Sequence, residues 1–164
     1  MNRLGDWMVT ASGGQYWPLD PRPAEVSIID IGAALSKLCR FGGHTARFYS
    51  VAEHSVLVSR VVPPFLQRQA LLHDAAEAYC ADVPRPLKIG LGEHYAEIEE
   101  LNWRVIAGRY LVHHVMHPIV KEADNAVLMA EKAALLPAGG PQWSVDVEPA
   151  DVEVVGHAPD AAFH

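Results

Sequence analysis

Apolar residues recur every three or four positions along most of the chain, which is the spacing of an amphipathic helix. Ile28, Ile31, Leu35 and Leu38 follow it over residues 26–39. The same spacing predicts further helices from Ser50 to about 62, from Pro64 through Glu77, over about 92–112, and from His117 to about Leu136. Together these segments predict an all-α bundle of about five to six helices over residues 26–136.

The first 23 residues lack this spacing, and their pattern predicts a small β-hairpin. Two short apolar stretches, residues 7–10 and 15–19, flank the turn sequence Ser12-Gly13-Gly14. Glycine tolerates the positive φ angles that tight hairpin turns require. Residues 20–23, Asp-Pro-Arg-Pro, then end this extension, because proline fixes φ and lacks a backbone donor.

Loop and cap signals separate the predicted helices. Ser50 followed by Glu53 is a capping-box pattern, which begins a helix. Residues 40–49, with two glycines at their centre, are predicted to be a loop, and residues 82–86, with two prolines, a rigid loop.

The length and composition predict one domain. A chain of 164 residues, half of them hydrophobic, can bury one real core. We expect that domain over residues 1–140, with a β extension at 1–23 and the helical core at 26–136. Residues 141–164 are rich in Pro, Ala, Asp and Glu. They form either a partly ordered tail or extra strands.

Charge and cysteine content narrow the class of protein. A formal net charge of −7 argues against binding duplex nucleic acid, which needs clustered lysine and arginine. Two cysteines without a Cys-x-x-Cys pair suggest a reducing compartment. No apolar run is long enough for a membrane span, and no secretion signal is visible. We therefore expect a cytoplasmic protein with no membrane partner.

The most informative chemistry is a group of ionisable residues in apolar helices. His73, Asp74 and Glu77 share one apolar segment, and burying them is costly unless their charge is compensated. His54 and Asp124 lie on apolar stripes of two other predicted helices. A single histidine on an apolar face is usually a hydrogen-bonded core residue. The prediction of a metal site therefore depends on the combination of these five residues. Mixed nitrogen and oxygen ligands favour Mn, Fe, Co, Ni or Zn over Ca or Mg.

Three sequence blocks carry a resemblance to a known family. They are residues 51–55 (Val-Ala-Glu-His-Ser), residues 72–77 (Leu-His-Asp-Ala-Ala-Glu) and residues 121–124 (Lys-Glu-Ala-Asp). The chain resembles the HD-domain metal phosphohydrolases over about residues 26–136, and most closely their small YfbR-like 5′-deoxynucleotidase group and related prophage proteins. The resemblance implies an HD-domain bundle in which His54, His73, Asp74 and Asp124 bind one divalent transition metal.

The same resemblance implies further site residues. Glu77 matches the catalytic glutamate and would act beside Asp74, and Arg40-Phe41 matches an arginine and aromatic pair that contacts substrate. Here phenylalanine replaces tryptophan, and the spacing to His54 is one residue shorter. Asp82 matches a residue that contacts the sugar hydroxyls, and Lys88 a basic residue near the phosphate.

Two histidine-containing segments are ambiguous. His44 and Arg47 lie in the loop before His54, where they would either contact a nucleotide or pack the loop. His113, His114 and His117 are closely spaced and would bind an adventitious metal or, as we favour, form a solvated helix end.

The predicted function is hydrolysis of a deoxynucleoside 5′-monophosphate to deoxynucleoside and phosphate. A phosphate monoester carries nearly two negative charges, so its site needs cations besides the metal. The alternatives are a deoxynucleoside triphosphohydrolase and a non-catalytic HD module that binds metal or nucleotide. The expected partner is a small-molecule nucleotide, and the relatives' dimers suggest a homodimer.

Overall fold

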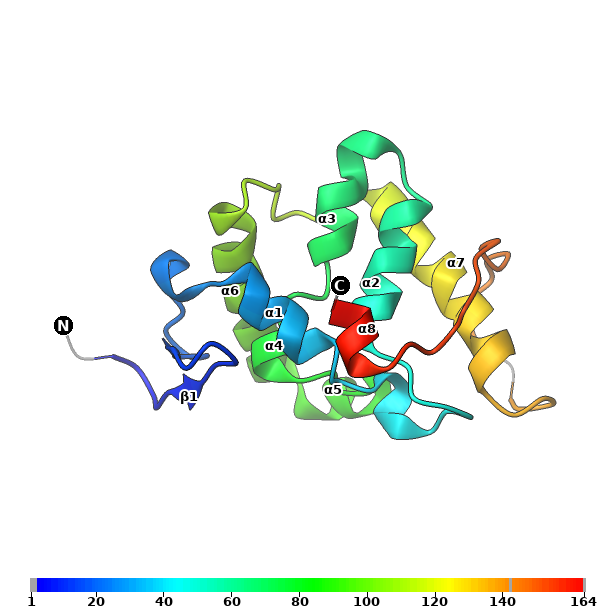
Figure 1. Ribbon diagram of the computed structural model, residues 1–164, viewed down its shortest axis with the longest axis horizontal. Helices are drawn as coiled ribbons and strands as arrows, with labels where there is room; N and C mark the ends of the chain where they lie inside the picture. Colours follow the sequence, from blue (N-terminus) through cyan, green and yellow to red (C-terminus); the bar gives the residue numbers. More distant parts are fainter. Residues whose placement is uncertain (1–2, 142, 164) are drawn as a thin grey trace.

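The structure is a computed structural model that describes residues 3–141 and 143–163. The described part is mostly helical, as the apolar spacing predicts (Figure 1). Its helices are α1 (Ile28–Leu35), α2 (Val51–Arg60), α3 (Gln67–Leu72), α4 (Glu77–Cys80), α5 (Arg85–Leu91), α6 (Glu93–Arg109), α7 (Pro118–Leu135) and α8 (Pro159–Phe163). Short 3₁₀ turns cover Pro23–Glu25, Arg40–Gly43 and Pro64–Leu66. Residues 1–2 of the expected β extension, and 142 and 164 of the expected tail, lie outside the described residues.

The N-terminal hairpin is confirmed. Strand β1 (Met8–Val9) pairs antiparallel with β2 (Gln15–Tyr16), with Met8 opposite Tyr16. Gly13 takes a φ of 85° in the turn, which suits glycine. Tyr16 is buried, and its hydroxyl donates to Asn102 of α6 over 2.7 Å, so the hairpin is attached to the helical core.

Serine and histidine caps begin the helices that carry the later site. Ser50 accepts from the backbone N–H of Glu53 over 3.1 Å at the start of α2. The Glu53 side chain does not complete the capping box, because its carboxylate accepts hydrogen bonds from the backbone of residues 155–157 instead. His117 caps α7 by accepting from the N–H of Ile119, and Pro118 occupies the first turn.

The predicted continuous helix from Pro64 through Glu77 is wrong. The α-helical pattern ends at Leu72, and α4 begins at Glu77. Between them the backbone N–H of Ala75 bonds to the carbonyl of Leu72 over 2.9 Å, a tighter i to i+3 turn. His73 and Asp74 therefore lie in a turn between two short helices.

The rigid loop predicted at residues 82–86 is also partly wrong, because α5 begins at Arg85. Pro86 occupies its first turn, where the missing N–H costs nothing. Gly92, with a φ of 74°, separates α5 from α6. The last predicted helix agrees closely with α7, while α1 and α6 are shorter than the predicted segments.

Two apolar clusters form the core, and α2 contributes to both. One joins the hairpin, α1, α2, α4 and α6 around Ile31, Trp103 and Ile106. The other joins α2, α3 and α7 around Val58 and Val127. In Figure 1 the hairpin and α7 lie toward opposite ends of the long axis, with α2 and α3 between them. Within the described residues, no helix is long and apolar enough to cross a membrane.

The described part of the C-terminal segment, residues 143–163, contains no strand and follows the surface of α7 and α2. The N–H of Ala150 donates to the carbonyl of Ala126 on α7 over 2.9 Å. Residues 155–157 then donate three backbone N–H groups to the carboxylate of Glu53, over 2.7–3.0 Å. The segment ends in α8, which packs against α2.

Candidate metal centre

Three predicted metal ligands converge from three parts of the chain. His54 lies on α2, His73 follows α3, and Asp124 lies on α7. Their ligand atoms lie within 4.8 Å of one another, so the group could hold a metal ion. His54 Nε2 is 3.3 Å from His73 Nε2 and 3.2 Å from Asp124 Oδ1.

Asp74, the fourth predicted ligand, lies beside this group. Its Oδ2 is 3.3 Å from His73 Nε2 and 3.6 Å from His54 Nε2. The tight turn after α3 thus places the side chains of both His73 and Asp74 beside His54. His54, His73 and Asp124 therefore form the group that could hold a metal ion, and Asp74 lies next to its two histidines.

The spacing of these atoms is compatible with a bound metal ion. Ligands about 2.0–2.2 Å from one ion lie about 3.3–3.6 Å apart in tetrahedral geometry. The pairs above span 3.2–3.6 Å, and His73 Nε2 to Asp124 Oδ1 is 3.9 Å. Two imidazoles with carboxylates also form the donor set that transition metals prefer.

In each of the two histidines, a hydrogen bond at Nδ1 fixes the orientation of the imidazole ring. His54 Nδ1 lies 2.6 Å from Glu131 Oε1, and His73 Nδ1 lies 2.7 Å from the carbonyl of Ala70. These partners accept a hydrogen bond, so each Nδ1 carries a proton and each Nε2 faces the cluster.

Electrostatics in the cluster favour a bound positive charge. Burial and Arg40 would lower the pKa of His54, but Glu131 and Asp124 raise it to about 9. Burial would raise the pKa of Asp124, but hydrogen bonds from His54 and His73 hold it well below its usual range. The pKa of Asp74 is likewise lowered, against its burial, by His73, His54 and Arg40. The pKa of Glu131 is lowered as well, so Asp74, Asp124 and Glu131 stay ionised around the buried imidazole of His54.

Glu131 on α7 is a site residue that the sequence analysis missed. It is fully buried, and it accepts hydrogen bonds from Tyr49 Oη over 2.7 Å and from Arg40 Nε over 3.2 Å. Burial would raise the pKa of Glu131, but His54 and Arg40 lower it. A sequence signal existed: Glu131 follows Asp124 by seven residues, which is two helical turns on the same apolar face.

Arg40 lies between this carboxylate and the cluster. Its side chain is 11% exposed, and its Nη1 lies 3.5 Å from Asp74 Oδ2. Burial would lower the pKa of Arg40, but Glu131 and Asp74 raise it, so the guanidinium stays charged. A buried cation thus stands beside the candidate metal ligands.

Glu77 lies one turn beyond Asp74 and is also buried. Its Oε1 is 3.5 Å from Lys88 Nζ, while its Oε2 is buried with no hydrogen-bond partner among the described residues. Burial, Asp74 and Asp82 together raise the pKa of Glu77 to about 9. The unpartnered oxygen marks Glu77 as a group that can hold a proton.

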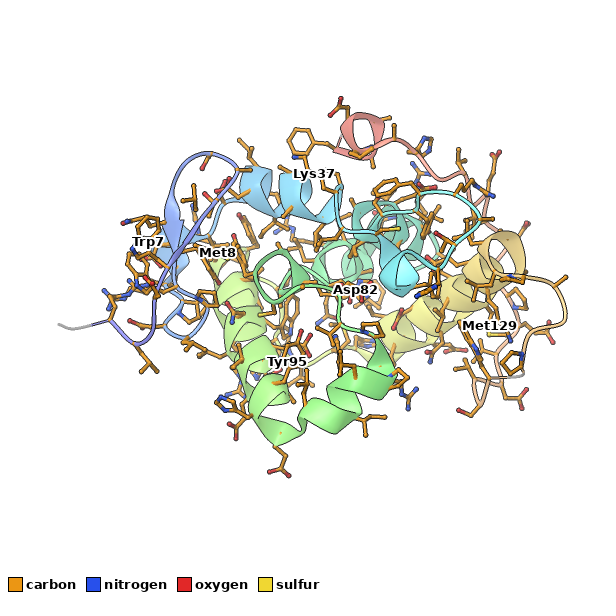
Figure 2. The ribbon with its side chains drawn as sticks, turned by 90° about the horizontal axis from the view of Figure 1, so that it is seen from below. Trp7, Met8, Lys37, Asp82, Tyr95 and Met129 are labelled. Atoms are coloured by element: carbon orange, nitrogen blue, oxygen red, sulfur yellow. The ribbon has the colours of Figure 1, made fainter. Side chains whose placement is uncertain are left out.

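Lys88 and Asp82 surround Glu77. Lys88 Nζ is also 2.7 Å from Glu99 Oε1, a contact that the sequence analysis did not anticipate. Burial raises the pKa of Asp82. Figure 2 shows Asp82 near the middle of the molecule, whereas Trp7 and Met129 lie toward its two ends.

The loop before α2 carries three residues that were predicted to contact substrate, Phe41, His44 and Arg47, and they lie in different surroundings. Phe41 follows Arg40 with a φ of 56°, and its ring lies 5.5 Å from the Arg40 guanidinium carbon and 6.2 Å from the ring of Trp143. Arg47 points elsewhere: it donates to the carbonyls of Val154 and Val155 over 2.6 and 2.7 Å. These hydrogen bonds fit the loop-packing alternative for Arg47, and its contact with substrate stays a prediction. His44 is exposed on the same loop.

In the second histidine group, His117 begins α7, and His113 and His114 lie in the loop before it. His117 caps α7, and the rings of His113 and His114 stack 5.2 Å apart. Within residues 3–141 and 143–163, these histidines belong to no group of potential ligands close enough to share an ion.

Comparison with known proteins identifies relatives. No family model matches the chain. It is 42% identical to the uncharacterized protein YfdR of Escherichia coli K12 over 136 residues, which cover 83% of this chain and 76% of YfdR. It is 34% identical to an uncharacterized protein of Rhodobacter capsulatus over 129 residues, which cover 73% of this chain and 66% of that protein. The chain therefore belongs to the same protein family as YfdR.

Proposed function

We propose that this protein is an HD-domain phosphohydrolase that cleaves the phosphate ester of deoxynucleoside 5′-monophosphates. The observation that carries the proposal is the convergence of His54, His73, Asp74 and Asp124 beside a buried arginine. HD-domain membership is part of the proposal, and it is supported by the order and spacing of these four residues in the helical fold.

One divalent transition metal, such as Co, Mn, Zn, Fe or Ni, would be held by these four side chains. When bound, such an ion lowers the pKa of water toward neutrality and offsets phosphate charge. The protein's part is to keep the Nε2 atoms of His54 and His73 facing the metal position, and the hydrogen bonds of their Nδ1 atoms to Glu131 and to the Ala70 carbonyl do this.

Two cations are available for the phosphate. Arg40 presents a planar fork of donors that matches phosphate oxygens, and Lys88 offers a point charge. Both also contact carboxylates, Arg40 with Asp74 and Lys88 with Glu77. Two cations beside a metal suit the near-dianionic charge of a monoester, and Arg47 is occupied by the C-terminal segment. A monophosphate is therefore favoured over a triphosphate.

Glu77 would handle the proton. Its Oε2 is buried and unpartnered among the described residues, close to the metal ligands in sequence and space. A protonated carboxyl group at this atom can donate to the departing 5′-oxygen of the deoxynucleoside. Asp82 would contact the sugar hydroxyls, and Phe41 the base. His44, exposed on the loop before α2, would also contact the nucleotide.

A nucleotide panel tests the proposal. Purified protein is incubated with mono-, di- and triphosphates of each deoxynucleoside, with Co, Mn, Zn or Ni, and the phosphate products are measured. Glu77→Gln is expected to lower kcat at least about a hundredfold, the usual scale for a proton-transferring group, with metal binding retained. Glu97→Gln, on an exposed part of α6, is the matched control and should leave kcat unchanged.

Two outcomes would replace the proposal. Release of tripolyphosphate from deoxynucleoside triphosphates, with monophosphates untouched, would identify a triphosphohydrolase. Saturable nucleotide binding without turnover under every metal would identify a binding module. In that case Glu77→Gln would have no kinetic effect to measure.

A further inference from the structure

A single buried carboxylate contacts both halves of the candidate site. Glu131 is fully buried on α7, and its two oxygens face different partners. We propose that Glu131 is a positioning residue that couples metal binding at His54 to anion binding at Arg40. The metal half of this inference stands on the cluster itself, and the anion half rests on the proposed function.

The contacts of Glu131 divide cleanly between its oxygens. Oε1 accepts from His54 Nδ1 over 2.6 Å and from Tyr49 Oη over 2.7 Å. Oε2 faces Arg40, with Nε and Nη2 both 3.2 Å away. A glutamine could reproduce one oxygen only, and its NH₂ group would face either the imidazole N–H or the guanidinium.

The His54 contact fixes the metal-facing atom. Because Glu131 accepts from Nδ1, the imidazole presents Nε2 toward His73 and Asp124. Carboxylates in this position orient a ligating histidine and raise its basicity, and their loss typically weakens metal binding about 10- to 100-fold.

The Arg40 contact fixes the anion-facing group. Two of its donors point at Glu131 and Nη1 lies near Asp74 Oδ2, which holds the guanidinium beside the metal ligands. Arginine has five N–H donors, so further donors remain for a phosphate oxygen. Loss of the Glu131 charge would free this guanidinium to move and would weaken phosphate binding together with metal binding.

The test compares three variants by isothermal titration with Co²⁺, followed by titration of the Co²⁺-loaded protein with inorganic phosphate. In Glu131→Gln the Co²⁺ Kd should rise at least about tenfold, and the phosphate Kd at least fivefold. Glu122→Gln makes the same substitution on the exposed side of α7 and should change neither Kd by more than twofold. Tyr49→Phe removes the third donor while sparing His54 and Arg40, and it should leave both Kd values within threefold.

Three results would overturn the inference. They are a folded Glu131→Gln protein with wild-type Co²⁺ affinity, equal losses in Glu131→Gln and Tyr49→Phe, and wild-type protein that binds no Co²⁺. Should Glu131→Gln fail to fold, ¹⁵N NMR of Zn²⁺-loaded wild-type protein decides instead. A protonated, hydrogen-bonded His54 Nδ1 is expected, and an unprotonated one refutes the inference. None of these measurements needs turnover, so a protein without phosphatase activity would still pass or fail them.

Discussion

The contact between Glu53 and the C-terminal segment gives a prediction whose size follows from its geometry. The carboxylate accepts three backbone N–H groups, from Val155 and Gly156 at Oε1 and from His157 at Oε2. In Glu53→Gln the amide oxygen can keep the first two, but its NH₂ group then faces the third donor. One charge-assisted hydrogen bond is lost, at about 1.5–3 kcal/mol, and two become weaker neutral bonds.

We therefore expect Glu53→Gln to lower the free energy of unfolding by roughly 3 kcal/mol. The loss cannot exceed the free energy that docks the C-terminal segment, because release of that segment returns its N–H groups to water. For a chain of this size, the loss corresponds to a fall in Tm of about 6–12 °C.

Calorimetry and hydrogen exchange check this prediction together. The amides of residues 155–157 should lose protection in Glu53→Gln while those of α2 keep it. Glu153→Gln removes a charge from an exposed side chain of the same segment and is the control. If the Tm of Glu53→Gln stays within about a degree of wild type, or if the three amides stay protected, the reasoning about this contact is refuted.

Three further predictions concern the metal, a buried hydroxyl and a thiol. Co²⁺ at a hundredfold excess over its Kd should raise the Tm of the wild type by about 5–11 °C, and an equal rise in Asp124→Ala would contradict the assignment of this ligand. Tyr16→Phe leaves the buried Asn102 Oδ1 without its donor, so urea unfolding should show a loss of about 1–3 kcal/mol, and no loss would contradict the buried contact. Burial and Glu99 raise the pKa of Cys80 to about 11, so little thiolate exists at pH 8. In a Cys39→Ser background, the rate of thiol modification should therefore rise about tenfold per pH unit up to pH 10, and a plateau near pH 8.5 would contradict the burial of Cys80.

The sequence predicted the helical class, the hairpin and a group of possible metal ligands, because each leaves a signal in the local pattern of residues. Apolar spacing marks helix faces, and the glycine turn marks the hairpin. Histidines and carboxylates on apolar faces indicate that something compensates their charge. The structure confirms a group that could hold a metal ion at His54, His73 and Asp124.

The errors arose where nonlocal packing decides the backbone or the partner. The segment from Pro64 through Glu77 has helical spacing, yet the chain tightens after Leu72, where His73 and Asp74 both turn to the cluster. Spacing cannot show this, since it reports only which face is apolar. Likewise, only the path of a segment a hundred residues later shows that Arg47 donates to the carbonyls of Val154 and Val155.

The position of Glu131 explains why the packing of α2 against α7 also determines the geometry of the candidate site. Glu131 and Asp124 lie two turns apart on α7, and they bracket the two nitrogens of the single imidazole on α2, at 2.6 and 3.2 Å. A slip of α2 along α7 by one helical turn, about 5.4 Å, would break both contacts and leave ionised groups buried without partners. Apolar residues alone tolerate such slips far better, because hydrophobic packing has little directional preference. The polar contacts therefore favour the observed register of α2 against α7, and in that register the candidate metal ligands lie close together.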